Sequence, residues 1–73
     1  MNNEKPIAVY SMTNSFGIEI MSMDDFKVRW RWSNDRKVRT SVIQEKLDKD
    51  TGRPAFRFRA NRCWIRLDEC MRI

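Results

Sequence analysis

The side chains that could carry catalytic or metal chemistry are few in this 73-residue chain. Histidine is absent, which removes the commonest general base and the imidazole ligands of most zinc sites. The two cysteines, Cys63 and Cys70, are separated by more than the roughly two to four residues of a zinc knuckle. We therefore interpret both as small core or half-buried thiols and predict no metal site.

Two pairs of adjacent acids are the other candidates for chemistry. Asp24 and Asp25 occupy neighbouring turn or strand positions, which point carboxylates apart, so we interpret them as a turn that accepts backbone hydrogen bonds. Asp68 and Glu69 are typical of the start of a helical turn. The two glycines of the chain lie too far apart to cradle a phosphate. These residues predict neither a cofactor site nor an enzyme.

The basic residues follow a regular pattern that the acids and cysteines lack. In residues 27–32 and 56–59, large apolar and cationic side chains alternate one for one. Successive side chains of a strand point to opposite faces, so each run buries one set and displays the other. The pattern predicts a cationic sheet face made of Lys27, Arg29, Arg31, Arg39, Arg57, Arg59, Arg62, Trp64 and Arg66.

Charge is distributed unevenly along the chain. Residues 1–26 contain one lysine and four acids, whereas residues 27–73 contain fourteen basic and six acidic residues, and the net charge is +5. Ten of the fifteen bases are arginine, which forks onto phosphates and stacks on aromatic rings in ways that lysine cannot. This asymmetry indicates an anionic partner.

The strands that must position these residues can be placed from period-two patterns and turn residues. We expect strands over residues 7–10, 16–21, 26–32, 38–43 and 55–59, with a turn at 13–15. The charged segment 44–52 is predicted to be a solvated loop or a frayed hairpin extension. Residues 67–73 favour one short helical turn followed by a short terminal strand.

Two hairpin registers follow from matching apolar faces. A three-residue loop, 34–36, would pair Trp30 with Thr40 and Trp32 with Val38, whereas a two-residue loop would set Trp30 against Arg39. We expect the three-residue loop, which also brings Arg39 beside Arg31 on the outer face.

In the last hairpin, a turn at Ala60 and Asn61 would pair Phe58 with Cys63 and Phe56 with Ile65. The same register pairs Arg57 with Trp64 and Arg59 with Arg62, and it places Trp64 between Arg57 and Arg66 for a cation–π stack.

The fold prediction is all-β with at most one short helical turn near the C-terminus. Five to six short strands without an internal repeat indicate a small curled antiparallel sheet, or an SH3-like or OB-like barrel. Residues 1–5 are expected to be a disordered lead-in and residues 6–73 a single small β-domain. The chain has no apolar run of membrane-spanning length and no secretory signal pattern, so we expect no membrane association and a cytoplasmic location.

The function expected from these features is non-enzymatic binding. Like charges facing each other across a ladder are destabilising, and a polyanion, above all nucleic acid, would relieve that repulsion. Only Trp64 is a candidate base-stacking platform, so the sequence does not favour a single strand over a duplex. One alternative is a small regulatory protein of the phage or mobile-element accessory kind, which docks on an acidic protein or forms a homodimer. Another is a solvated face in a protein whose function lies elsewhere.

Overall fold

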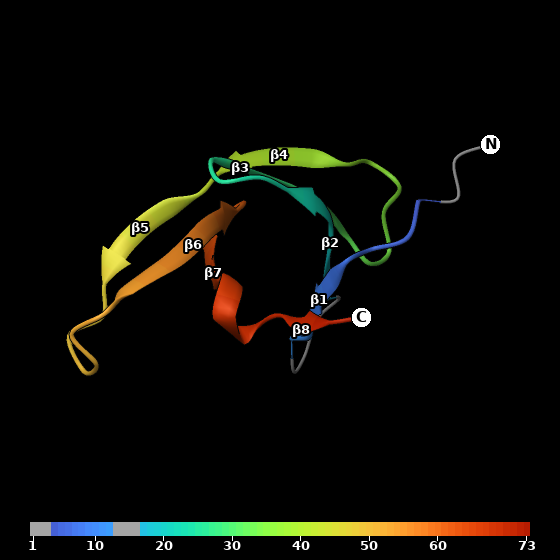
Figure 1. Cartoon of the computed structure of the whole chain (residues 1–73). Coiled ribbons are helices and arrows are strands. Elements are labelled where there is room, and N and C mark those ends of the chain that lie inside the picture. Colours follow the sequence, from blue (N-terminus) through green and yellow to red (C-terminus); the bar gives the residue numbers. More distant parts are fainter. Residues whose placement is uncertain (1–3, 13–16) are drawn as a thin grey trace.

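The computed structural model describes residues 4–12 and 17–73 and contains two antiparallel sheets. The five-stranded sheet has the order β4-β3-β2-β1-β8 and the three-stranded sheet the order β5-β6-β7 (Figure 1). Their bounds are β1 Ala8–Tyr10, β2 Ile18–Met23, β3 Lys27–Trp32, β4 Arg39–Val42, β5 Gln44–Leu47, β6 Pro54–Ala60, β7 Cys63–Arg66 and β8 Met71–Arg72. A single 3₁₀ turn, η1 (Leu67–Glu69), precedes β8.

This architecture confirms the small all-β prediction and the helical turn before a terminal strand. The described residues form eight strands rather than five or six, because the chain changes sheet at two corners. At one corner β4 leads into β5 through Ile43 alone, and at the other η1 carries the chain from β7 to β8. The two sheets curl toward each other without closing into a barrel (Figure 1). The turn predicted at 13–15 and residues 1–3 of the predicted lead-in lie outside the described residues.

The core lies between the inner faces of the two sheets. Trp30 of β3 packs against Phe58 of β6 with ring centroids 6.1 Å apart, and it meets Trp32 edge-on at 5.3 Å. These alternating positions are the ones that the period-two pattern predicts to be buried. Complete burial of one such side chain stabilises the fold by about 1.5–3 kcal/mol. The largest fully buried side chains are Trp30, Phe58, Ile18, Ile20, Ile65 and Val28.

A hydrogen-bond chain joins the two sheets beside this core. The indole N–H of Trp30 donates to Ser41 Oγ at 2.8 Å, and the Ser41 hydroxyl donates to the carbonyl oxygen of Arg59 at 2.9 Å. These hydrogen bonds therefore link β3, β4 and β6. They also give an acceptor to the indole N–H of Trp30, a residue that is only 2% exposed. The same bonds fix the position of Arg59 in β6 relative to the five-stranded sheet.

The register expected for β3 and β4 is wrong. Trp30 lies opposite Arg39, and Val28 lies opposite Ser41. The charge at position 39 does not prevent this register, because the Arg39 guanidinium lies 5.6 Å from the centroid of the Trp30 ring and 3.6 Å from the Asp35 carboxylate. In this register the Arg39 cation stacks on the Trp30 indole, and the indole N–H finds an acceptor in Ser41. These two interactions stabilise the observed register more than the pairing of apolar residues would stabilise the expected one.

The register expected for β6 and β7 is also wrong, by two residues. The turn is at Asn61 and Arg62, and Phe58 lies opposite Ile65 while Arg59 lies opposite Trp64. Asn61 has a φ of 58°, a left-handed conformation that asparagine tolerates better than most residues. A shift of two residues keeps every side chain on its predicted face, so the division into inner and outer residues survives although the pairs change.

The segment 44–52 contains a strand, so the expectation of a loop there is wrong and its alternative, an extension of the hairpin, holds. β5 pairs with β6 from Gln44 opposite Arg57 to Leu47 opposite Pro54. This hairpin projects beyond the core along the longest dimension of the molecule, 44 Å (Figure 1). Phe56, on the inner side of β6, is consequently 48% exposed rather than buried as expected.

None of the helical segments in the described residues is long and apolar enough to cross a membrane.

Candidate functional site

The basic residues of β3 lie on the outer side of the five-stranded sheet. We call Lys27, Arg29 and Arg31 the five-stranded face. Arg31 donates to Glu19, which lies directly opposite it in β2, at 2.9 and 3.1 Å. Arg29 forms an ion pair with Glu4 at 3.0 Å. Two of the three cations are therefore neutralised by the chain's own carboxylates, and Glu4 of the predicted disordered lead-in takes part in one of these contacts.

Arg39 lies apart from these residues. Because it is opposite Trp30, its side chain points to the inner side of the sheet rather than beside Arg31 as expected. Its nearest acid is Asp35, whose pKa is lowered, first by a hydrogen bond from the backbone N–H of Lys37 and also by the Arg39 charge. Arg39 thus supports the hairpin and does not contribute to a cationic outer face.

The outer side of the three-stranded sheet carries a second group, which we call the three-stranded face and define as Lys46, Arg57, Arg59, Trp64 and Arg66. The guanidinium carbon of Arg57 lies 3.9 Å from the centroid of the Trp64 ring, and that of Arg59 lies 5.6 Å from it. The cation–π stack expected on Trp64 is therefore present, with Arg59 in place of Arg66 as the second cation. Arg62 is exposed in the turn between β6 and β7.

Arg66 is the neutralised member of the three-stranded face. Its guanidinium is 2.7 Å from Asp68, 3.4 Å from Asp48 and 3.9 Å from Glu69. The carboxylates of Asp68 and Asp48 raise the pKa of Arg66, and the hydrogen bond to Asp68 is the largest cause. Arg66 lies directly opposite Arg57, so the carboxylates also relieve the repulsion between two arginines in adjacent strands.

No carboxylate among the described residues pairs with Lys46, Arg57 or Arg59, in contrast to Arg66. Arg59 donates from its Nε to the backbone carbonyl of Asn61 at 3.1 Å. The Nε of Arg57 is buried and has no hydrogen-bond partner in the described part of the chain. Three strand cations without a carboxylate partner in the described residues, Lys46, Arg57 and Arg59, therefore lie together on the three-stranded face.

The nine residues predicted from the sequence do not form one surface. The inner faces of the two sheets meet in the core, so the five-stranded and three-stranded faces point away from each other. The structure brings together Arg57, Arg59, Trp64 and Arg66, with Arg62 at the end of the same hairpin, and separates them from Lys27, Arg29, Arg31 and Arg39.

Lys46 belongs to this site, and sequence reasoning missed it. It lies opposite Ala55 in the ladder and therefore on the same side as Arg57. The hairpin-extension alternative for residues 44–52 contained the signal, because the alternation of Gln44 and Lys46 with Glu45 and Leu47 continues onto this face once β5 is a strand.

The cysteines and acids show no constellation for metal chemistry within residues 4–12 and 17–73, where no group of three or more histidine, cysteine or acidic side chains could hold an ion. Cys70 is half-buried as expected, but the expectation for Cys63 is wrong, because this residue at the start of β7 is exposed. Burial, with the nearby charges of Glu69 and Asp68, raises the pKa of the Cys70 thiol to about 11. This thiol stays protonated near neutral pH, which is the state of an inert structural cysteine.

The acidic turn has the structure that its sequence predicts. One carboxylate oxygen of Asp24 accepts hydrogen bonds from the backbone N–H groups of Phe26 and Lys27, both at 2.7 Å. These bonds lower the pKa of Asp24 and close the turn between β2 and β3.

Comparisons with known proteins give no match: no family model, no curated protein and no solved structure resembles this chain at a significant level.

Proposed function

We propose that this chain is a non-enzymatic module that binds nucleic acid through the three-stranded face and the adjoining Arg62. The observation that carries the proposal is the contrast in pairing. Arg29 and Arg31 have carboxylate partners at 3.0 and 2.9 Å, whereas Arg57 and Arg59 flank the Trp64 ring without one. Cations that folding leaves unpaired on one surface are the usual footprint of phosphate binding.

The stacked arrangement supports phosphate recognition rather than a merely solvated surface. A guanidinium held over an indole loses little conformational freedom when it binds, and its planar N–H groups match the geometry of a phosphate. The Nε of Arg57 and the Nη1 of Arg39 are both buried without a hydrogen-bond acceptor. Arg39 has the Asp35 carboxylate at 3.6 Å to balance its charge, whereas Arg57 has no carboxylate partner in the described residues. An incoming phosphate supplies the missing negative charge beside Arg57.

The test is the salt dependence of binding to a random-sequence oligonucleotide, measured by fluorescence anisotropy with the full chain. We expect the affinity to fall steeply between about 50 and 200 mM salt. The double variant Arg57→Gln/Arg59→Gln should make the slope of log K against log salt shallower by about 1.4, which corresponds to two lost phosphate contacts. The matched variant Arg29→Gln/Arg31→Gln should leave the slope close to that of the parent. Binding that ignores salt, or equal effects of the two variants, would rule out this proposal.

A second candidate function, association with another copy of this chain, is supported by a different region. β5 has a partner strand on one side only, so the backbone groups of its other edge are free to pair. The projecting hairpin also exposes Leu47 (62%) at the end of β5 and, on its inner side, Phe56 (48%). Antiparallel pairing of β5 with β5 of a second copy would extend the sheet and cover these residues.

Sedimentation equilibrium distinguishes this candidate. A concentration-dependent dimer that is lost in Phe56→Ser but retained in Thr40→Ser, an exposed position in β4, is the expected result. A monomer at every concentration removes the candidate and leaves the nucleic-acid proposal untouched.

A further inference from the structure

A groove crosses the outer side of the three-stranded sheet and has a volume of about 480 Å³. Ala55 of β6 lies opposite Lys46 in the ladder, and its small side chain leaves the hollow between the longer side chains of β5 and β7. A volume of this size falls within the range of binding sites for small organic groups, about 300–1,000 Å³. The residues that line it are Lys46, Leu47, Asp48, Lys49, Ala55, Arg57, Trp64, Arg66 and Glu69.

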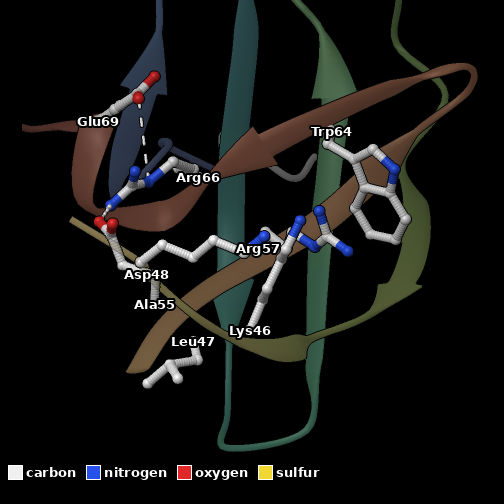
Figure 2. A pocket seen from close by; sticks show the side chains of 9 residues that line it. Lys46, Leu47, Asp48, Ala55, Arg57, Trp64, Arg66 and Glu69 are labelled. Atoms are coloured by element: carbon white, nitrogen blue, oxygen red, sulfur yellow. Dashed lines mark hydrogen bonds and ion pairs between the residues drawn. The ribbon is translucent and has the colours of Figure 1, made fainter. Parts of the chain in front are cut away.

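The two ends of the groove differ in charge. At one end Arg66 turns toward Asp48 and Glu69, which together with Asp68 neutralise it (Figure 2). At the other end Lys46 and Arg57 both extend toward Trp64 (Figure 2), and no carboxylate of the described residues pairs with either. Two unpaired cations that converge on one point repel each other, and an anion between them removes that repulsion.

An aromatic surface lies directly beside this anion position. Arg57 covers Trp64 at 3.9 Å from the ring centroid, yet the Trp64 residue remains 38% exposed. The planes of the indole and the guanidinium are both surfaces on which a nucleobase can stack. A phosphate position next to a stacking surface matches one nucleotide unit.

We propose, resting on the nucleic-acid function above, that the groove binds one nucleotide of a single strand. The phosphate lies between Lys46 and Arg57, and the base packs on the exposed part of the Arg57–Trp64 stack. Bases of a duplex are paired and stacked on each other, so they cannot reach this surface without being flipped out. The three-stranded face therefore selects unpaired strands, a preference that the alternating pattern alone does not predict.

Fluorescence anisotropy with the full chain tests this inference, with a labelled dT 12-mer and a 12-base-pair duplex as probes at the same salt concentration. The parent should bind the single strand about tenfold more tightly than the duplex. Trp64→Leu should weaken single-strand binding by about tenfold, since stacking on an aromatic ring contributes this much per base. Duplex binding should change little, and Trp64→Phe should restore most of the loss because it returns a ring.

Lys46→Gln tests the phosphate position separately, with Lys27→Gln on the opposite side of the molecule as its matched control. Lys46→Gln should make the single-strand salt slope shallower by about 0.7, the value for one phosphate contact, and Lys27→Gln should not. Circular dichroism of each variant confirms that it is folded before its binding is interpreted.

The outcomes separate the two proposals. Equal or tighter binding of the duplex, with no effect of Trp64→Leu, overturns single-strand selection while the nucleic-acid function stands. An absence of binding to both probes at low salt overturns the function itself and this inference with it.

Discussion

Arg29 and Arg31 in β3 and Arg57 and Arg59 in β6 occupy equivalent positions in two alternating strands, one in each sheet. Both pairs point outward, but only the first pair meets carboxylates. The difference comes from the neighbouring strands. β3 lies beside β2, which belongs to the acidic first part of the chain, whereas β6 lies between β5 and β7, which belong to the basic remainder.

The comparison shows that alternation decides whether an arginine is exposed, and strand pairing decides whether its charge is free. Glu19 faces Arg31 across the ladder, while Arg59 faces Trp64. Two of the four acids of residues 1–26, Glu4 and Glu19, pair with arginines of the five-stranded face, whereas no acid of the described residues pairs with Arg57 or Arg59. The single cationic sheet face that the sequence pattern predicts is therefore replaced by two surfaces, one with paired arginines and one with unpaired cations.

The largest expected effect comes from removing the side chain of Phe58, which packs between the two sheets. Phe58 is completely buried between the sheets, and Phe56, two positions earlier on the same side of β6, is 48% exposed. Phe58→Ala should lower the free energy of unfolding by about 3–5 kcal/mol, and Phe56→Ala by about 1 kcal/mol or less. Urea unfolding followed by tryptophan fluorescence measures both. Equal losses would mean that the projecting half of the hairpin is packed as tightly as the core.

The hydrogen-bond chain between the sheets is the next test. Ser41→Ala leaves the Trp30 indole N–H without its acceptor and removes the donor to the Arg59 carbonyl. The expected loss is about 1–3 kcal/mol, the cost of a buried unsatisfied polar group. Thr40→Ala is the control, because this exposed neighbour points to the other side of β4. The midpoints of thermal unfolding of the two variants should differ clearly. Similar midpoints would show that the hydrogen bonds of Ser41 contribute little to the stability of the fold.

How far the sequence predicts this molecule can be seen in single residues. Period-two alternation places Val28, Trp30 and Phe58 in the core, as the structure confirms, because apolar burial depends mainly on the face of a strand. It does not fix which residues are opposite each other. A shift of two residues in the last hairpin leaves every side chain on the same face of its strand, so the alternating pattern is equally compatible with both registers. In the structure Phe58 lies opposite Ile65 instead of Cys63.

The same alternation predicts part of the candidate site, because it places Trp64, Arg57 and Arg59 on one face. The neutralisation of Arg29 was not predictable, since its partner Glu4 lies 25 residues away in the chain and is brought near only by the fold. Lys46 was missed because β5 is rich in charged residues, and its pairing with β6 rather than its own propensity makes it a strand.

Removing the carboxylates of the five-stranded face converts it into a second charged surface. In Glu4→Gln/Glu19→Gln the charges of Arg29 and Arg31 become free, so the slope of log K against log salt for a single strand should steepen by up to about 1.4. The stability cost should be about 1 kcal/mol or less for the exposed Arg29–Glu4 pair and larger for the part-buried Arg31–Glu19 pair with its two hydrogen bonds. Anisotropy titrations over a range of salt concentrations measure this change.

The control for that experiment is Asp25→Asn/Glu45→Gln, which changes the net charge equally at two acids that form no ion pair with Arg29 or Arg31. If both double variants steepen the slope to the same extent, overall charge rather than local pairing distinguishes the two faces.

The smallest expected effect concerns the neutralised end of the charged face. The pKa of Asp48 is lowered, first by a hydrogen bond from the backbone N–H of Asp50 at 2.9 Å and then by the positive charge of Arg66. A carboxyl whose pKa is lower in the folded state stabilises the fold above its unfolded pKa, and that stabilisation is lost as the pH falls through the folded pKa. The free energy of unfolding should therefore be nearly constant from about pH 5 to 7 and should decline below about pH 4.

The variant Asp48→Asn tests this prediction by urea unfolding at a series of pH values. Its free energy of unfolding should decline less steeply below about pH 4 than that of the parent, because one of the carboxyls responsible has been removed. Parallel curves for the two proteins would show that Asp48 is equally protonated in the folded and unfolded chain, and that Arg66 is held by Asp68 and Glu69 alone.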